Sequence, residues 1–222
     1  MARVISLVVA VAFLLAGCGG VNGPSHGGDR PQANAFVAAA GSGDADTVRR
    51  AISAGIDVDA RDTGGRTAVT AAALGEHTDV VRLLVDAGAD VNLQDNDRNN
   101  ALLVCGETGN VEVLREVVRA KPDLTLTNRF GGTALIPAAD RGHVGMVRAL
   151  LETDIPIDHV NRLGWTALLE AVLLGDGGPA HQQIVRLLVA AGADVELADR
   201  DGVTPLEHAR RRGLGEIAQL LE

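Results

Sequence analysis

The segment Asp199-Arg200-Asp201-Gly202-Val203-Thr204-Pro205-Leu206 holds the signals that decide the fold. An aspartate followed three residues later by glycine is typical of a tight turn in which a short side chain bonds the backbone. The threonine can accept a hydrogen bond from a free N–H group at a helix N-terminus, and proline is favoured in the first helical turn. The segment therefore predicts a turn that leads directly into a helix.

The same signals recur with a period of 33 residues. The positions equivalent to Thr204 hold threonine or asparagine, at spacings of 33, 33, 33, 33 and finally 38 residues: Asn34, Thr67, Asn100, Thr133 and Thr166. A small residue follows each of them five positions later: Ala39, Ala72, Cys105, Ala138, Ala171 and Ala209. Small side chains let helices stack closely, so we expect Cys105 to be a core thiol. A fixed period of this length indicates a repeat array.

A second apolar stripe follows each of these segments at helical spacing, as in residues 80–84. The stripe ends at Ala-Gly-Ala-Asp-Val, residues 87–91 and again 191–195, where Gly88 and Gly192 are expected in a left-handed conformation. Each unit is thus a turn, two short helices and an extended loop. One unit buries too little apolar surface to offset the entropy of ordering its backbone, so stability must come from contacts between neighbouring units.

The segment 199–206 and the stretch Gly88-Ala89-Asp90-Val91-Asn92 resemble the ankyrin repeat. The resemblance covers residues 34–222 in six copies, near 34–66, 67–99, 100–132, 133–165, 166–203 and 204–222. It implies an all-α solenoid of stacked helix-turn-helix units with projecting β-turn fingers, whose concave face and fingers bind another protein. His77 and His143 occupy the family's common histidine before the second helix, which implies a framework role and not a metal site. The histidine that the family usually has three residues after the capping threonine is absent from all six copies.

The composition limits the function classes. Aromatic residues are only 2% of the chain, which favours many small helix–helix contacts over one large core. The formal charge of −9 argues against a nucleic-acid partner, because proteins that bind nucleic acids carry a basic face. The sequence holds no Gly-x-Ser-x-Gly, phosphate loop, His-Glu-x-x-His or paired-cysteine motif. We therefore expect a monomeric binding protein without catalytic residues, cofactor or metal.

The first residues are typical of an export signal. Arg3 precedes an apolar run of 13 residues, 4–16, which is shorter than the roughly 20 residues of a membrane-spanning helix. The run ends in Leu15-Ala16-Gly17-Cys18, which resembles the lipobox of bacterial lipoproteins. This resemblance implies cleavage before Cys18, lipid on its thiol, and anchoring at the extracytoplasmic face of a membrane. The alternative is an ordinary secretion signal (residues 1–17) in which Cys18 is incidental. Residues 18–33, rich in glycine and proline, are expected to form a flexible tether.

Several side chains are candidates for partner contact. Glu107, Asp140 and Glu170 fall on the first helix of their units, at positions that the family leaves variable and turns toward the concave face. Trp165 lies on a finger, and tryptophan is frequent among the residues that dominate binding energy. Most other carboxylates fall in turns, where they are expected to bond the backbone.

Two irregularities add further candidates. In the third unit Arg98 replaces the turn glycine, through either sequence drift or a binding role. In the fifth unit the five extra residues 176–180 separate the two helices. Insertions in solenoids map to loops on one face, so Asp176 and the adjacent His181 are candidate contacts, with neutral loop growth as the alternative.

The combined expectation is a lipid-anchored adaptor that binds a protein partner. The net negative charge is compatible with a basic partner, although a solvated acidic surface is its commoner explanation. The alternative is a dedicated inhibitor or protective partner of a secreted enzyme or toxin. An enzyme or a small-ligand protein would instead require a deep polar pocket with perturbed titratable groups.

Overall fold

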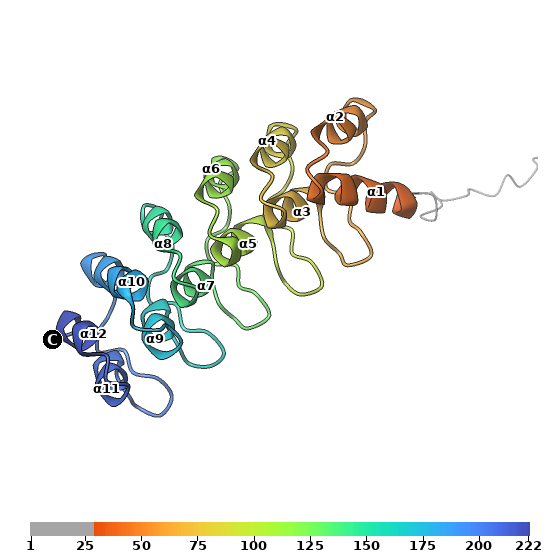
Figure 1. The fold of residues 1–222 in the computed structure, drawn as a ribbon. Coiled ribbons are helices and arrows are strands. Elements are labelled where there is room, and N and C mark those ends of the chain that lie inside the picture. Colours follow the sequence, from red (N-terminus) through yellow and green to blue (C-terminus); the bar gives the residue numbers. More distant parts are fainter. Residues whose placement is uncertain (1–28) are drawn as a thin grey trace, which may run out of the picture.

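The computed structural model describes residues 29–222, which form twelve helices in two rows (Figure 1). The odd-numbered helices form the inner row, beside the projecting fingers: α1 (Asp29–Gly41), α3 (Ala68–Leu74), α5 (Ala101–Thr108), α7 (Leu135–Asp140), α9 (Ala167–Leu173) and α11 (Pro205–Arg211). The even-numbered helices form the outer row: α2 (Ala45–Ser53), α4 (Thr78–Asp86), α6 (Val111–Arg119), α8 (Val144–Leu151), α10 (Pro179–Ala190) and α12 (Gly215–Leu220). The all-α solenoid is confirmed. The predicted signal segment and Cys18 lie outside the described residues.

One apolar core runs the length of the stack. The small-residue series is buried there as predicted, and Cys105 is a free thiol in its centre. Burial raises the pKa of the Cys105 thiol to about 12, which keeps it protonated and unreactive near neutral pH. Within residues 29–222, no helix has the length and apolarity that a membrane crossing requires.

Four of the six predicted helix caps are confirmed. Thr67, Asn100, Thr166 and Thr204 each accept a bond from the backbone N–H three residues on. Thr133 does not cap: α7 begins one residue later than its equivalents, after Ala134, and the buried Thr133 hydroxyl has no partner. Asn34 does not cap either, because it lies inside α1 and its Oδ1 accepts a bond from the backbone N–H of Thr63 at 3.1 Å.

The predicted tether is too long at its C-terminal end. Helix α1 begins at Asp29, so residues 29–33 are helical rather than part of a flexible segment. Pro31 lies in the first turn, where its missing N–H leaves no helical bond unmade, and Ala33 is already buried against the stack. Burial of this first turn explains why helix formation extends beyond the repeat boundary.

The loop glycines adopt the predicted left-handed conformation, with φ of 87° at Gly88 and 92° at Gly192. The third repeat differs because Arg98 and Lys121 stand where most other repeats have glycine; the fourth repeat has Asp154 at the position of Lys121. Both Arg98 and Lys121 still adopt positive φ, 63° and 53° respectively. The third repeat therefore keeps both left-handed turns without glycine, at a cost in backbone strain.

A row of side chains ties four of the inner helices, α1, α5, α7 and α9, to the next repeat. Three histidines donate from Nε2 to a backbone carbonyl at the C-terminal end of the preceding inner helix: His77 to Gly41 (3.1 Å), His143 to Glu107 (3.1 Å) and His181 to Asp140 (2.9 Å). In the last repeat Arg212 makes the equivalent link, to Gly175 at 2.9 Å. The predicted framework role of His77 and His143 is confirmed.

The inserted residues lengthen α10 at its N-terminus and leave this link intact. Asp176 accepts a bond from Nδ1 of His181 at 2.9 Å, so both ring nitrogens of His181 are engaged within the stack. His181 is also buried. Its prediction as a partner contact is therefore wrong: the inserted residues shift its number, but the ring occupies the same framework position as His77 and His143. Asp176 remains exposed.

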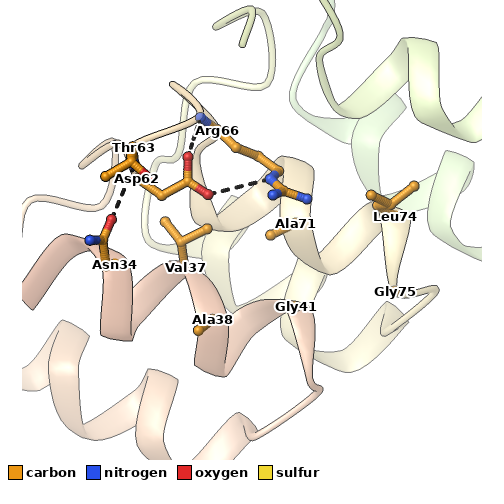
Figure 2. Close-up of a pocket in the computed structure, with 10 residues that line it drawn as sticks. All are labelled: Asn34, Val37, Ala38, Gly41, Asp62, Thr63, Arg66, Ala71, Leu74 and Gly75. Atoms are coloured by element: carbon orange, nitrogen blue, oxygen red, sulfur yellow. Dashed lines mark hydrogen bonds and ion pairs between the residues drawn. The ribbon is translucent and has the colours of Figure 1, made fainter. Parts of the chain in front are cut away.

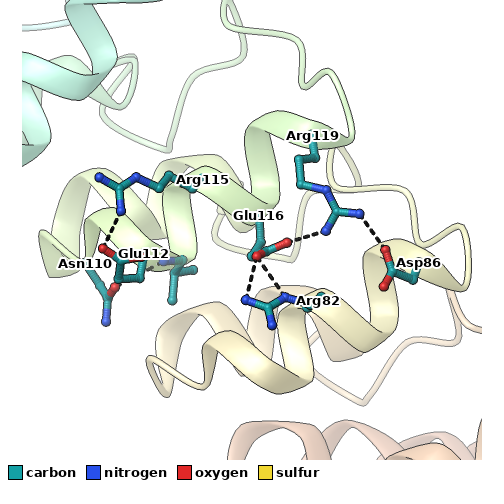
Figure 3. Close-up of polar contacts among 8 residues, drawn as sticks. Arg82, Asp86, Asn110, Glu112, Arg115, Glu116 and Arg119 are labelled. Carbon is teal, nitrogen blue, oxygen red and sulfur yellow. Dashed lines mark hydrogen bonds and ion pairs between the residues drawn. The ribbon is translucent and has the colours of Figure 1, made fainter.

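The outer row carries its own charged links. Glu116 on α6 accepts hydrogen bonds from Arg82 of α4 and from Arg119, and Arg119 also pairs with Asp86 of α4 at 2.7 Å (Figure 3). Glu116 is only 8% exposed, yet it is bonded by two guanidinium groups. This network joins the second and third repeats on the side away from the fingers.

Candidate protein-binding groove

The inner helices and fingers of the third to fifth repeats enclose a cavity of about 170 Å³. Three carboxylates line it, one from each successive inner helix: Glu107 on α5, Asp140 on α7 and Glu170 on α9. Phe130 and Leu163, from two successive fingers, form its rim. We call these five residues the acidic groove. The structure thus brings together all three carboxylates that the sequence singled out.

The first two carboxylates differ in their pairing. Glu107 forms an ion pair with Arg141 at 2.7 Å, which links two neighbouring inner helices. Within residues 29–222, no hydrogen bond or ion pair reaches the side chain of Asp140, whose backbone carbonyl bonds His181. The groove therefore keeps at least one carboxylate without a counter-charge.

Glu170 is the most enclosed of the three, at 7% exposure. Its Oε1 accepts a hydrogen bond from Nδ2 of Asn161 at 2.6 Å. The Oδ1 atom of Asn161 in turn accepts bonds from the backbone N–H groups of Leu163 (2.9 Å) and Trp165 (3.1 Å), which shape the finger. Glu170 is thereby fixed to the turn that carries the rim residue Leu163.

Burial and the nearby Asp140 carboxylate raise the pKa of Glu170 to about 7, against the opposing hydrogen bond from Asn161. The cause is physical and local: a carboxylate loses hydration in the cavity and faces a second acid instead of a base. Near neutral pH the protonated and charged forms of Glu170 are both populated, and a cation placed in the cavity would favour the charged form.

The rim is apolar and unusually exposed. Phe130 is 58% exposed and Leu163 is 53% exposed, although both are large hydrophobic residues. The equivalent finger positions in other repeats hold Gly64, Asp97 and Asp201. The guanidinium of Arg129 lies 4.9 Å from the centre of the Phe130 ring. Exposed apolar groups beside a polar cavity are typical of a contact surface.

A larger hollow, about 420 Å³, lies between the first two repeats (Figure 2). Its acid is compensated: Asp62 accepts bonds from the backbone N–H groups of Gly64 and Arg66 and lies 3.4 Å from the Arg66 guanidinium. Asn34 is bonded to Thr63 across the hollow. This hollow is larger than the acidic groove, but its polar groups are already satisfied, so the acidic groove is the stronger candidate.

The remaining sequence candidates lie outside the groove lining. Arg98 is exposed on the third finger, and Trp165 is half-buried at the end of the fifth finger. Sequence reasoning missed Asn161, Phe130 and Leu163. Asn161 occupies a turn position that bonds its own backbone in every finger, so nothing distinguished it. The two rim residues could have been found as large apolar side chains at turn positions that elsewhere hold glycine or aspartate.

Known proteins share this architecture. An ankyrin repeat domain from Acinetobacter baumannii AYE is 47% identical, with a TM-score of 0.81, over 84% of this chain and 95% of that chain. A chain of the complex between the predatory endopeptidase Bd0816 of Bdellovibrio bacteriovorus and the immunity protein Bd3460 is 26% identical, with a TM-score of 0.72, over 84% of this chain and 96% of that chain. The putative ankyrin repeat protein YahD of Escherichia coli K12 is 57% identical over 51 residues, which is 23% of this chain and only 25% of that protein.

The family described as ankyrin repeats (3 copies) matches residues 35–128 and 102–199, most of the part that the structure describes. Its members are generally non-catalytic modules that bind other proteins. Two overlapping matches of three repeats each agree with the uninterrupted stack of helix pairs in Figure 1. This chain belongs to the ankyrin repeat family.

Proposed function

We propose that this chain is a monomeric, non-catalytic adaptor that holds a protein partner in the acidic groove. The observation that carries the proposal is the convergence of three carboxylates and two exposed apolar finger residues on one cavity. Apolar rim residues supply area to bury, and the partly uncompensated acids supply specificity. The outer row lacks this combination, because its buried acid Glu116 is already paired within the stack.

Site-specific crosslinking tests this proposal. A photoreactive phenylalanine analogue is placed at Leu163 in the rim and, as a matched control, at the exposed Arg115 on the outer helix α6. In cells that naturally make the protein, we expect one discrete protein adduct from position 163 and none from position 115. Equal adducts from both positions, or no adduct from position 163, would contradict the groove as the binding surface.

We further propose that Cys18 carries a lipid that anchors the protein at the extracytoplasmic face of a membrane. The support is the sequence Leu15-Ala16-Gly17-Cys18 after an apolar run. Metabolic labelling with an alkyne fatty acid should mark the parent chain and Cys105→Ser, but not Cys18→Ser. Equal labelling of Cys18→Ser would remove the anchor from the proposal and leave the groove unaffected.

A second candidate function is protection against, or inhibition of, one basic secreted enzyme or toxin. Two observations favour it: the uncompensated acids of the groove, and the likeness to a chain from a complex of an endopeptidase with an immunity protein. An inhibitor must lower the activity of the crosslinked partner when the two are mixed, whereas an adaptor leaves it unchanged. An acidic groove on a basic site also predicts affinity that falls steeply with salt.

A further inference from the structure

We propose that the acidic groove receives one arginine side chain, which a partner protein presents beside an apolar residue. This inference rests on the proposed function, because it names the chemistry by which the groove recognises its protein partner. The arginine would lie between Asp140 and Glu170, and the apolar neighbour would pack on Phe130 and Leu163.

The first argument compares two buried glutamates. Glu116 and Glu170 are almost equally enclosed, at 8% and 7% exposure. Glu116 is bonded by Arg82 and Arg119, whereas within residues 29–222 the only side chain that bonds Glu170 is the neutral amide of Asn161. Buried charges in proteins are normally paired, so the missing counter-charge at Glu170 is the exception that requires an explanation.

The second argument concerns the position of Glu170 in the repeat. The equivalent residues in the second to fourth repeats carry no charge: Ala71, Val104 and Pro137. In the sixth repeat the position holds His208, which is satisfied inside its own repeat by Asp199 at 2.7 Å. In the fifth repeat the equivalent pair is Asn161 and Glu170, and no hydrogen bond among the described residues reaches the second carboxylate oxygen, Oε2. The other repeats fold without an acid at this position, so the fold does not require Glu170. Its Oε2 atom is available to a ligand.

The third argument is the size and shape of the site. A cavity of about 170 Å³ is smaller than the roughly 300–1,000 Å³ of small-molecule clefts, and suits the end of one side chain. Its unpaired acids come from two neighbouring helices, α7 and α9, so they can be bonded together by a planar group with several donors. A guanidinium has this geometry, whereas an ammonium is a compact point charge. Arg141 also lines the cavity but is already paired with Glu107.

The test uses three peptide probes with the purified full chain at pH 8 and low salt: acetyl-Leu-Arg-Leu-amide, its lysine analogue and its citrulline analogue. Citrulline has the shape of arginine without the charge. In nuclear magnetic resonance titrations we expect the arginine peptide to bind at least about ten-fold more tightly than the citrulline peptide, with the lysine peptide between them. The perturbed backbone signals should centre on residues 130, 140, 163 and 170.

Glu170→Gln and Asp140→Asn should each reduce the preference for arginine over citrulline to less than about three-fold. Glu112→Gln, an exposed acid on the outer row, is the matched control and should keep the full preference. Equal binding of the arginine and citrulline peptides, or a preference that survives in Glu170→Gln, would overturn the proposal. Lysine binding as tight as arginine would overturn the choice of guanidinium.

The two proposals fail separately. If position 163 crosslinks to a partner but the peptides show no charge preference, the proposed function stands and this inference is wrong. If the peptide preference is present but position 163 gives no adduct, the pocket binds a cation but the groove is not the docking surface for a protein.

Discussion

Lys121 is a single residue whose backbone is strained in the folded stack. It adopts a φ of 53° at the position where its neighbours in the repeat series have Gly88 and Gly55, with φ of 87° and 80°. A side chain in the left-handed region costs about 1–2 kcal/mol, and glycine avoids that strain. The fourth repeat has Asp154 at this position without a positive φ, so Lys121 takes the turn of the first two repeats and bears its strain.

Replacing Lys121 by glycine should therefore stabilise the protein. The lower strain is partly offset by the extra flexibility that glycine gives to the unfolded chain, so we expect a net gain of about 0.5–1 kcal/mol. Urea denaturation followed by circular dichroism measures the gain. The matched reverse change, Gly88→Lys, should lower stability. A Lys121→Gly variant less stable than the parent would mean that the lysine side chain makes a stabilising contact.

Glu170 should make stability depend on pH. Its pKa is raised from 4.5 to about 7, so the folded chain holds this proton more tightly than the unfolded chain. The protonated Glu170 side chain therefore adds to the free energy of unfolding, and this addition is fully present below about pH 4.5. It amounts to about 1–3 kcal/mol and is lost as the pH rises to about 7. The charged groups that share the cavity with it are Glu107, Asp140 and Arg141.

Glu170→Gln should remove this part of the pH dependence, and above pH 7 it should be more stable than the parent. Urea denaturation at pH 5 and pH 8 gives the comparison. Parallel stability changes in the parent and the variant would show that Glu170 is not responsible. The gain in stability, combined with the expected loss of arginine binding, would indicate an acid retained for recognition at a cost in stability.

At the scale of the helix, the sequence predicts those features that depend on residues close together in the chain. The caps at Thr67, Asn100, Thr166 and Thr204 were predictable because a cap acts on the N–H three residues on. Asn34 was not, because it bonds the next finger. Thr133 was not either: α7 begins one residue later than its equivalents, and the Thr133 hydroxyl has no partner among the described residues. The role of His181 was hidden by the insertion, which shifts the 33-residue register that identified His77 and His143.

The link between the outer helices α4 and α6 gives a prediction at this scale. Burial acts to raise the pKa of Glu116, but hydrogen bonds from Arg119 and Arg82 outweigh it, so the pKa is lowered (Figure 3). Glu116→Ala should cost about 1–3 kcal/mol, because it removes a buried partner of two cations. The control is Glu112→Ala on the same helix, whose exposed pair with Arg115 should be worth less than about 1 kcal/mol. Thermal denaturation compares them, and equal losses would contradict a special role for the network.

For the whole molecule, the fold could be predicted from the sequence because the array repeats one unit of a turn, two short helices and a loop. The sequence also predicted that Glu107, Asp140 and Glu170 share a face: Glu107 and Asp140 hold equivalent positions 33 residues apart, and Glu170 lies one helical turn before the equivalent position in its own repeat. It could not predict the cavity between them or the bond from Asn161 to Glu170, because both depend on how a finger folds back on the following helix. Nor could it show that Glu107 is paired while Asp140 is not.

Gly106 provides a test of how the array holds together. It is buried on α5, where a Cβ atom would collide with the carbonyl oxygen of Ala134 and lie 2.9 Å from its Cα. Equivalent positions hold Ala73 and Ala139, so α5 and α7 approach more closely here than a side chain permits. Backbone cannot yield as a flexible side chain does, and Gly106→Ala must push the third and fourth repeats apart.

We expect Gly106→Ala to lose about 1–3 kcal/mol and to unfold in two steps, because each repeat is stabilised mainly by its neighbours and a weakened interface divides the stack. Trp165, the single tryptophan, reports only on the C-terminal half, whereas circular dichroism reports on all helices. Urea transitions by the two methods should coincide in the parent and separate in the variant. Gly145→Ala is the control, since its Cβ would lie 3.5 Å from Val111 in ordinary contact and should not destabilise. Coincident transitions in Gly106→Ala would mean that coupling between repeats extends beyond nearest neighbours.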